Sequence, residues 1–150
     1  MTKEILLYGH NGSGNHGCEA IVRATNKVIK NSIPKINITL ATGGIEEDKK
    51  YGVDKIVNLV KEKNKVNKLT LPYISAYLKL KVFKDELPAE MLAYRKTFYS
   101  VNSDTISFSI GGDNFCYPGY ERFIMIHNMI REKGAKTVLW GCSVEPRKIN

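Results

Sequence analysis

The stretch that decides the fold is "ILLYGHNGSGNHGCEAIVRATNKVIK", residues 5–30. Its first four residues are apolar and stop at a glycine, which is typical of a short strand buried on both faces of a sheet. From residue 19 to residue 30, apolar side chains recur at helical spacing, at Ile21, Ala24, Val28 and Ile29. The stretch therefore predicts a strand, a glycine-rich turn and a helix, in that order.

The same alternation continues along the chain. Further strands are expected at residues 36–41, 56–60, 104–110 and 136–144, and further helices at residues 71–83, 88–99 and 120–132. In the helix at residues 71–83, Pro72 lies in the first turn after a candidate cap, Thr70. One face of that helix carries Leu71, Ile74, Leu78 and Val82. The alternation predicts an α/β fold, a Rossmann-like doubly wound parallel sheet with helices on both faces.

The composition is that of an ordinary soluble globular protein, with 43% apolar and 25% charged residues among 150. A chain of this length buries one full core, so we expect a single domain over residues 1–150. The sequence shows no signal-type segment and no apolar run long enough to cross a bilayer, which indicates a cytoplasmic protein. Cys18, Cys116 and Cys142 form no C-x-x-C pair, so we expect reduced thiols and no metal site.

The net charge of +8 favours anionic partners. Seven lysines lie between residues 49 and 68, but this run lacks the interleaved aromatic and arginine residues of a nucleic-acid surface. We therefore expect no nucleic-acid partner and interpret the lysine run as solvated surface.

The turn after the first strand is rich in glycine. Gly12, Gly14 and Gly17 have the G-x-G-x-x-G spacing of dinucleotide sites, but residues 41–43 supply no acidic group that would bind a ribose. Glu46 and Glu47 lie further out in the connection. A P-loop is excluded, because residues 15–16 are Asn-His where Lys-Ser/Thr is required. What remains is the property common to both motifs: backbone amides and a helix amino terminus suited to a carboxylate, phosphate or pyrophosphate.

Side chains of this turn are candidates for chemistry. His16, and less strongly His10, could donate to an oxyanion or act as general acid or base, although either could merely fix the turn by a hydrogen bond. Cys18 near a helix amino terminus could be a nucleophile, but a small buried side chain is the favoured interpretation.

A second glycine turn follows the strand at residues 104–110. Asp113 and Asn114 come directly after Gly111 and Gly112, and could hold sugar hydroxyls or simply form the turn. Because ligands of open parallel sheets bind at the carboxyl ends of the strands, we expect both turns to face one crevice.

Three segments together resemble the amino-terminal half of the polysaccharide pyruvyl transferase family: "GSGNHGCEAIVRAT" (residues 12–25), "SIGGDNFCY" (109–117) and "GCSVEP" (141–146). The resemblance implies one half of a two-domain, glycosyltransferase-B-like architecture. It also implies transfer of pyruvate from phosphoenolpyruvate to saccharide hydroxyls, forming a ketal in cell-surface polysaccharide biosynthesis. Phosphoenolpyruvate is then the donor substrate, and no separate cofactor is expected.

The expected site combines these segments. We predict His16 and Asp113 as catalytic residues. The predicted substrate-binding residues are Gly12, Ser13, Gly14, Asn15, Gly17, Glu19, Gly111, Gly112 and Asn114. Cys18 departs from the version of the family motif that carries aspartate, so no acid or base role is carried over to that position.

The resemblance also sets the expected partners. We expect the chain to be the amino-terminal half of a longer protein, with a missing carboxyl-terminal domain and a saccharide or lipid-linked oligosaccharide as acceptor. The alternatives are a glycosyltransferase that uses a sugar nucleotide, and a non-catalytic saccharide- or nucleotide-binding domain. The helix at residues 71–83 is favoured to cover a sheet face, but Lys79, Lys81 and Lys84 could instead meet the inner face of a membrane.

Overall fold

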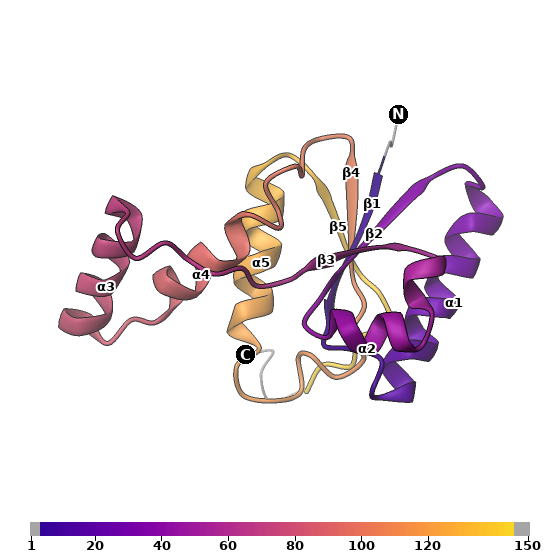
Figure 1. Ribbon diagram of the computed structural model, residues 1–150, viewed down its shortest axis with the longest axis horizontal. Helices are drawn as coiled ribbons and strands as arrows, with labels where there is room; N and C mark the ends of the chain where they lie inside the picture. The colour runs from indigo at the N-terminus through magenta and orange to yellow at the C-terminus, as the bar shows by residue number, and fades with distance from the viewer. Residues whose placement is uncertain (1–3, 146–150) are drawn as a thin grey trace.

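Five parallel strands form one sheet in the order β3-β2-β1-β4-β5 in the computed structural model, which describes residues 4–145 (Figure 1). The strands are β1 (Glu4–His10), β2 (Asn37–Thr42), β3 (Asn58–Lys61), β4 (Thr105–Ser109) and β5 (Lys136–Leu139). The helices are α1 (His16–Ser32), α2 (Ile45–Lys50), the short 3₁₀ helix η1 (Val53–Lys55), α3 (Leu71–Phe83), α4 (Leu87–Arg95) and α5 (Glu121–Glu132). The predicted Rossmann-like α/β fold is confirmed.

Strand β1 is buried on both faces of the sheet, as its apolar run predicts. Leu6 and Tyr8 belong to a core shared with α5, whereas Ile5 and Leu7 belong to a second core shared with α1. Helices α1 and α2 accordingly lie on one side of the sheet and α4 and α5 on the other (Figure 1). Alternate side chains of one strand thus bind the two helical layers together.

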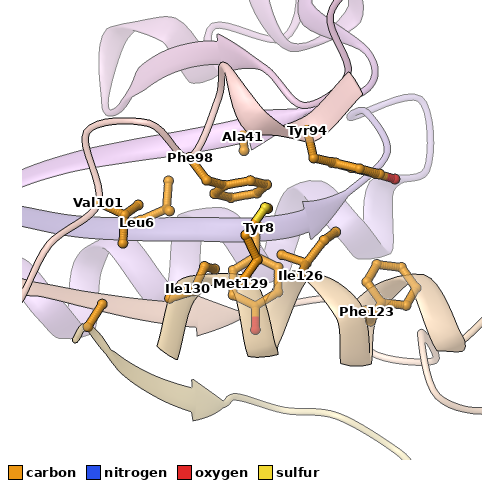
Figure 2. Close-up of a cluster of buried hydrophobic side chains, with 11 residues drawn as sticks. Leu6, Tyr8, Ala41, Tyr94, Phe98, Val101, Phe123, Ile126, Met129 and Ile130 are labelled. Atoms are coloured by element: carbon orange, nitrogen blue, oxygen red, sulfur yellow. The ribbon is translucent and has the colours of Figure 1, made fainter. Parts of the chain in front are cut away.

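Aromatic residues fill the core on the α5 side. Tyr8 lies edge-on to Phe98, with ring centroids 6.2 Å apart, and Ile126 and Met129 of α5 lie around the tyrosine ring (Figure 2). All four side chains are buried. This packing holds α5 against the middle of the sheet and so fixes where the first turn of α5 meets the strand ends.

The order of the strands places a crevice between β1 and β4. From β1 the chain winds outward through β2 to β3, and it then returns to pair β4 with the other side of β1, where Tyr8 lies opposite Ser109. In such sheets the connections after the two central strands leave toward opposite faces, which opens a crevice at their carboxyl ends. Both glycine turns lie at this point.

Helix α3 forms as predicted but does not cover a sheet face, so that part of the prediction is wrong. It lies away from the sheet, against α4 (Figure 1). The residues expected to be buried are exposed: Leu71 (81%), Ile74 (47%), Leu78 (56%) and Val82 (67%). The buried residue of α3 is the small Ala76. Apolar side chains occur nearly all round α3, so their spacing does not define a single face.

Several boundaries also differ from prediction. Residues 45–50, interpreted as a polar connection, form α2, and the third strand starts two residues later than expected. Helix α1 begins at His16 rather than at residue 19, because the Asn15 side chain accepts a hydrogen bond from Gly17 N–H and caps it. Thr70 precedes α3, but its side chain makes no capping hydrogen bond, and its hydroxyl donates to the Asn67 carbonyl instead. Across residues 4–145, every helix falls short of the length and apolar character that crossing a membrane requires.

Candidate anion-binding site

The two glycine turns lie side by side and line a cavity of about 490 Å³ at the carboxyl edge of the sheet. The first turn and α1 contribute Gly9, Asn11, Gly12, Gly14, Asn15 and Cys18. The second turn contributes Gly111, Asp113, Asn114 and the segment 117–119, while Glu47 of α2 and Arg122 and Phe123 of α5 complete the wall. Asn15 and Asp113 therefore line one cavity, as the strand order requires.

A hydrogen bond ties the second turn to the first. The Asn114 Nδ2 amide donates to the Gly9 carbonyl over 3.0 Å. This approach depends on Gly111, because a Cβ atom at that position would overlap the Asn114 amide. Gly9 itself has a φ of +86°, a conformation that favours glycine. The glycines thus allow the two turns to touch through backbone and amide groups.

A buried polar network holds the first turn against α2. The Asp48 carboxylate lies 2.9 Å from His10 Nε2 and accepts a hydrogen bond from the Ser13 hydroxyl over 2.5 Å. All three side chains are buried. Burial alone would raise the pKa of Asp48, but hydrogen bonds from Ser13, Thr42 and His10 outweigh it and lower that pKa below its usual value. Ser13 and His10 therefore shape the turn, and Ser13 does not line the cavity.

Glu47 occupies part of the cavity that sequence reasoning assigned to a ligand. Its Oε2 atom accepts a hydrogen bond from Gly14 N–H over 3.1 Å. A carboxylate of the chain itself thus lies on an amide of the glycine turn, where an anionic ligand would replace it. Glu47 follows β2 by five positions. The sequence placed it further out than a ribose-binding acid and gave it no role, and only the fold of α2 brings it back to the glycine turn.

His16 and Glu19 lie outside this cavity. The His16 side chain is 75% exposed, its Nδ1 atom lies 3.3 Å from Glu19 Oε2, and its ring meets Tyr51 edge-on. Glu19 also accepts a hydrogen bond from Arg23 Nε over 2.7 Å, and this bond, followed by the one to His16, lowers the pKa of Glu19. Gly17 serves the Asn15 cap, and neither it nor Gly112 lines the cavity.

The predicted site residues thus divide in two. Those that line the cavity are Gly12, Gly14, Asn15, Gly111, Asp113 and Asn114. Cys18 lines it too, and burial, with a smaller contribution from Asp113, raises the pKa of its thiol. A raised pKa favours the thiol over the thiolate, which argues against a nucleophile. The Cys18 side chain is half-buried and lines the cavity, so it is not the fully buried side chain that was predicted.

Arg122 is a site residue that sequence reasoning missed. It lies in the first turn of α5 and lines both the main cavity and a second hollow of about 300 Å³ that continues toward β3. The second hollow also takes in Lys61 and Lys63. These lysines belong to the run interpreted as solvated surface, and only the position of β3 beside the crevice distinguishes them from the rest of that run.

Comparison of the chain with models of protein families, with curated proteins and with solved structures finds no match. Among the residues described, Cys18, Cys116 and Cys142 form no disulfide. Within residues 4–145, no three His, Cys, Asp or Glu side chains gather in a way that could hold a metal ion.

Proposed function

We propose that this chain forms the amino-terminal half of a polysaccharide pyruvyl transferase, and that it binds a small anionic donor in the cavity between the two glycine turns. One observation carries the proposal. The two segments with the strongest resemblance to that family, around Gly14 and Asp113, line a single cavity and are joined by the hydrogen bond from Asn114 to Gly9. A cavity at the switch point of a parallel sheet is a usual place for such a ligand.

The lining suggests a division of roles. The amides of the glycine turn, the amino terminus of α1 and Arg122 would hold the carboxylate and phosphate of phosphoenolpyruvate. The exposed Asp113 carboxylate, beside the Asn114 amide, would accept the proton of a sugar hydroxyl. During transfer, two sugar hydroxyls lose their protons as their oxygens bond to C2, and the bond from C2 to the phosphate oxygen breaks. One proton equivalent goes to the enol carbon, and the other leaves with the phosphate. His16 could supply a proton only after its side chain leaves Glu19.

A second candidate is a glycosyltransferase with a sugar-nucleotide donor. Glu47 favours it, because an acidic side chain beside the glycine turn could accept hydrogen bonds from ribose hydroxyls. If the protein is a pyruvyl transferase, the Glu47 carboxylate must move off the Gly14 amide before phosphoenolpyruvate can bind there.

Isothermal titration calorimetry of the 150-residue chain separates the two candidates. We expect phosphoenolpyruvate to bind and uridine diphosphate sugars not to bind. Arg122→Gln should weaken phosphoenolpyruvate binding about tenfold or more, whereas Arg131→Gln, an exposed arginine of the same helix, should leave it unchanged. Binding of the sugar nucleotide without phosphoenolpyruvate would favour the glycosyltransferase.

The surface of α3 supports contact with an anionic membrane as part of this proposal. Its exposed apolar residues include Leu71 and Phe83, at 81% and 75% exposure, and Lys79, Lys81 and Lys84 are exposed among them. Apolar side chains that enter the interface and lysines that meet lipid phosphates are the two requirements for peripheral binding. A lipid-linked acceptor would be reached from such a position.

A further inference from the structure

Glu62 is a fixed carboxyl group at the end of β3. Its backbone N–H donates to the Thr42 carbonyl over 2.9 Å, and its carbonyl accepts from the Thr97 hydroxyl over 2.9 Å. The residue is held from both sides, and its side chain lines the second hollow between β3 and α5. Its position is therefore set by the sheet rather than by a free loop.

The Glu62 carboxyl group is largely buried and incompletely hydrogen-bonded. Its Oε1 atom has no hydrogen-bond partner within residues 4–145. Burial raises the pKa of Glu62 to about 7, against the lowering effects of Arg122, Lys63 and a hydrogen bond from the Gly9 backbone. Six other buried side-chain oxygens among the residues described also lack a partner, but Glu62 is the one residue of this group that lines the second hollow. A ligand in that hollow could therefore supply the missing hydrogen bond.

Positive charge surrounds this carboxyl group. The ionisable groups that face it or share its hollow are Arg122 of α5, Lys61 at the end of β3, Lys63 two residues later, Glu90 and Tyr94 of α4, and His10 of β1. Lys63 donates to Glu90 over 2.6 Å, which offsets part of its charge. Arg122 lies over the Phe123 ring and has no ion-pair partner among the residues described. The balance of charge in the hollow favours an anion.

We propose that the second hollow is a binding site for a small dianion, and that Glu62 binds this dianion as a neutral acid by donating its proton to a ligand oxygen beside Arg122. A carboxylate next to an anion would be repelled, so the ligand selects the protonated form. Binding at this site then takes up a proton from solvent. The inference goes beyond the proposed function, because it requires neither phosphoenolpyruvate nor any reaction.

Calorimetry with two dianions tests the site on the whole chain. Oxalate and sulfate are useful probes, because both stay fully ionised between about pH 6 and about pH 8, where Glu62 changes its charge. We expect at least one of them to bind about tenfold more tightly at the lower pH, and to take up a proton at the higher pH. Preference for oxalate would indicate a carboxylate ligand, and preference for sulfate a phosphate-like one.

Variants assign the proton to Glu62. Glu62→Gln supplies a neutral donor at every pH, so it should keep the affinity seen at about pH 6 and lose the pH dependence. Arg122→Gln should weaken binding at both pH values, but less at the higher pH, because loss of the charge that lowers the pKa of Glu62 leaves more of the neutral acid there. Glu121→Gln removes an exposed carboxylate next to Arg122 that lines neither cavity, and should change nothing. Carbon-13 NMR of the Glu62 carboxyl group in the unsubstituted chain should show its pKa rising when the dianion is added.

Three results would overturn the inference: no binding of either dianion, equal affinity at both pH values, or a pH dependence that survives in Glu62→Gln. A pH dependence that survives in Glu62→Gln would mean that another group takes up the proton. His10, which lines the same hollow, is one such group. None of these outcomes depends on transfer of pyruvate. Failure of the anion site and failure of the proposed activity are therefore separate results.

Discussion

The carboxyl edge of the sheet and helix α3 are built in opposite ways. At the edge lies a buried polar network, in which Asp48 is hydrogen-bonded to His10 and Ser13. On α3, apolar side chains face solvent, and the small Ala76 is the buried one. Removing one of these polar side chains leaves its hydrogen-bond partners buried and unpaired, which is costly. Removing an exposed apolar side chain from α3 breaks few contacts inside the protein. Stability should therefore respond strongly at the edge and weakly on α3.

The largest effect is expected for Asp48→Ala. The change leaves His10 and Ser13 without their shared acceptor, so the free energy of unfolding should fall by roughly 3 kcal/mol. Asp54→Ala, at an exposed position of η1, should cost less than about 0.5 kcal/mol. Urea denaturation followed by circular dichroism measures both. Equal losses would mean that the network does not stabilise the turn.

Glu62→Gln should have the next largest effect, and its sign depends on pH. The folded pKa of about 7 lies above the usual value for glutamate, so the folded chain binds this proton more tightly than the unfolded chain. The associated stability is present at acid pH and is lost as pH rises through 7. Between about pH 5 and about pH 8 the wild type should lose roughly 2 kcal/mol relative to the variant. If stability fell with pH by the same amount in the wild type and in Glu62→Gln, this prediction would be wrong. Glu121→Gln, which removes an exposed carboxylate, is the control and should follow the wild type.

Gly111→Ala should have a smaller effect on the same edge. The added methyl group displaces the Asn114 amide and breaks its hydrogen bond to Gly9, which should cost about 1 kcal/mol and weaken anion binding. At Gly112 an added Cβ would lie 3.5 Å from Ile21 Cδ1, an ordinary contact, so Gly112→Ala is the matched control. Thermal melts and calorimetry with oxalate compare the two variants. If the two variants had the same stability and the same affinity for oxalate, the hydrogen bond from Asn114 to Gly9 would not depend on the glycine at position 111.

The smallest effect on stability is expected on α3. Leu71→Ser, Val82→Ser and Phe83→Ser should each change the free energy of unfolding by less than about 0.5 kcal/mol, because these side chains are already exposed. Their effect should appear in binding to vesicles instead. The wild type should sediment with vesicles rich in anionic lipid, less so at high salt, and the triple variant should remain in solution. If the wild type did not bind these vesicles even at low salt, the proposed contact of α3 with a membrane would be wrong.

The same contrast explains what could be predicted from the sequence. Asn15 and Asp113 were expected to share one crevice, because parallel strands bring their following turns to one edge of the sheet. The environment of α3 was not predictable, since spacing records which residues are apolar but not what lies against them. Glu62 and Arg122 belong to no motif. Only the strand order and the packing of α5 bring these two residues to the same hollow.

The hydrogen bond from Asn114 to Gly9 joins residues 105 positions apart. During synthesis, the amino-terminal glycine turn leaves the ribosome long before its partner exists. The pairing of β1 with β2 can form early, but the cavity cannot close until β4 and the turn after it have emerged. Until then the inner edge of β1 is unpaired on the side that β4 will occupy, so the nascent chain is most vulnerable to misassembly during that interval.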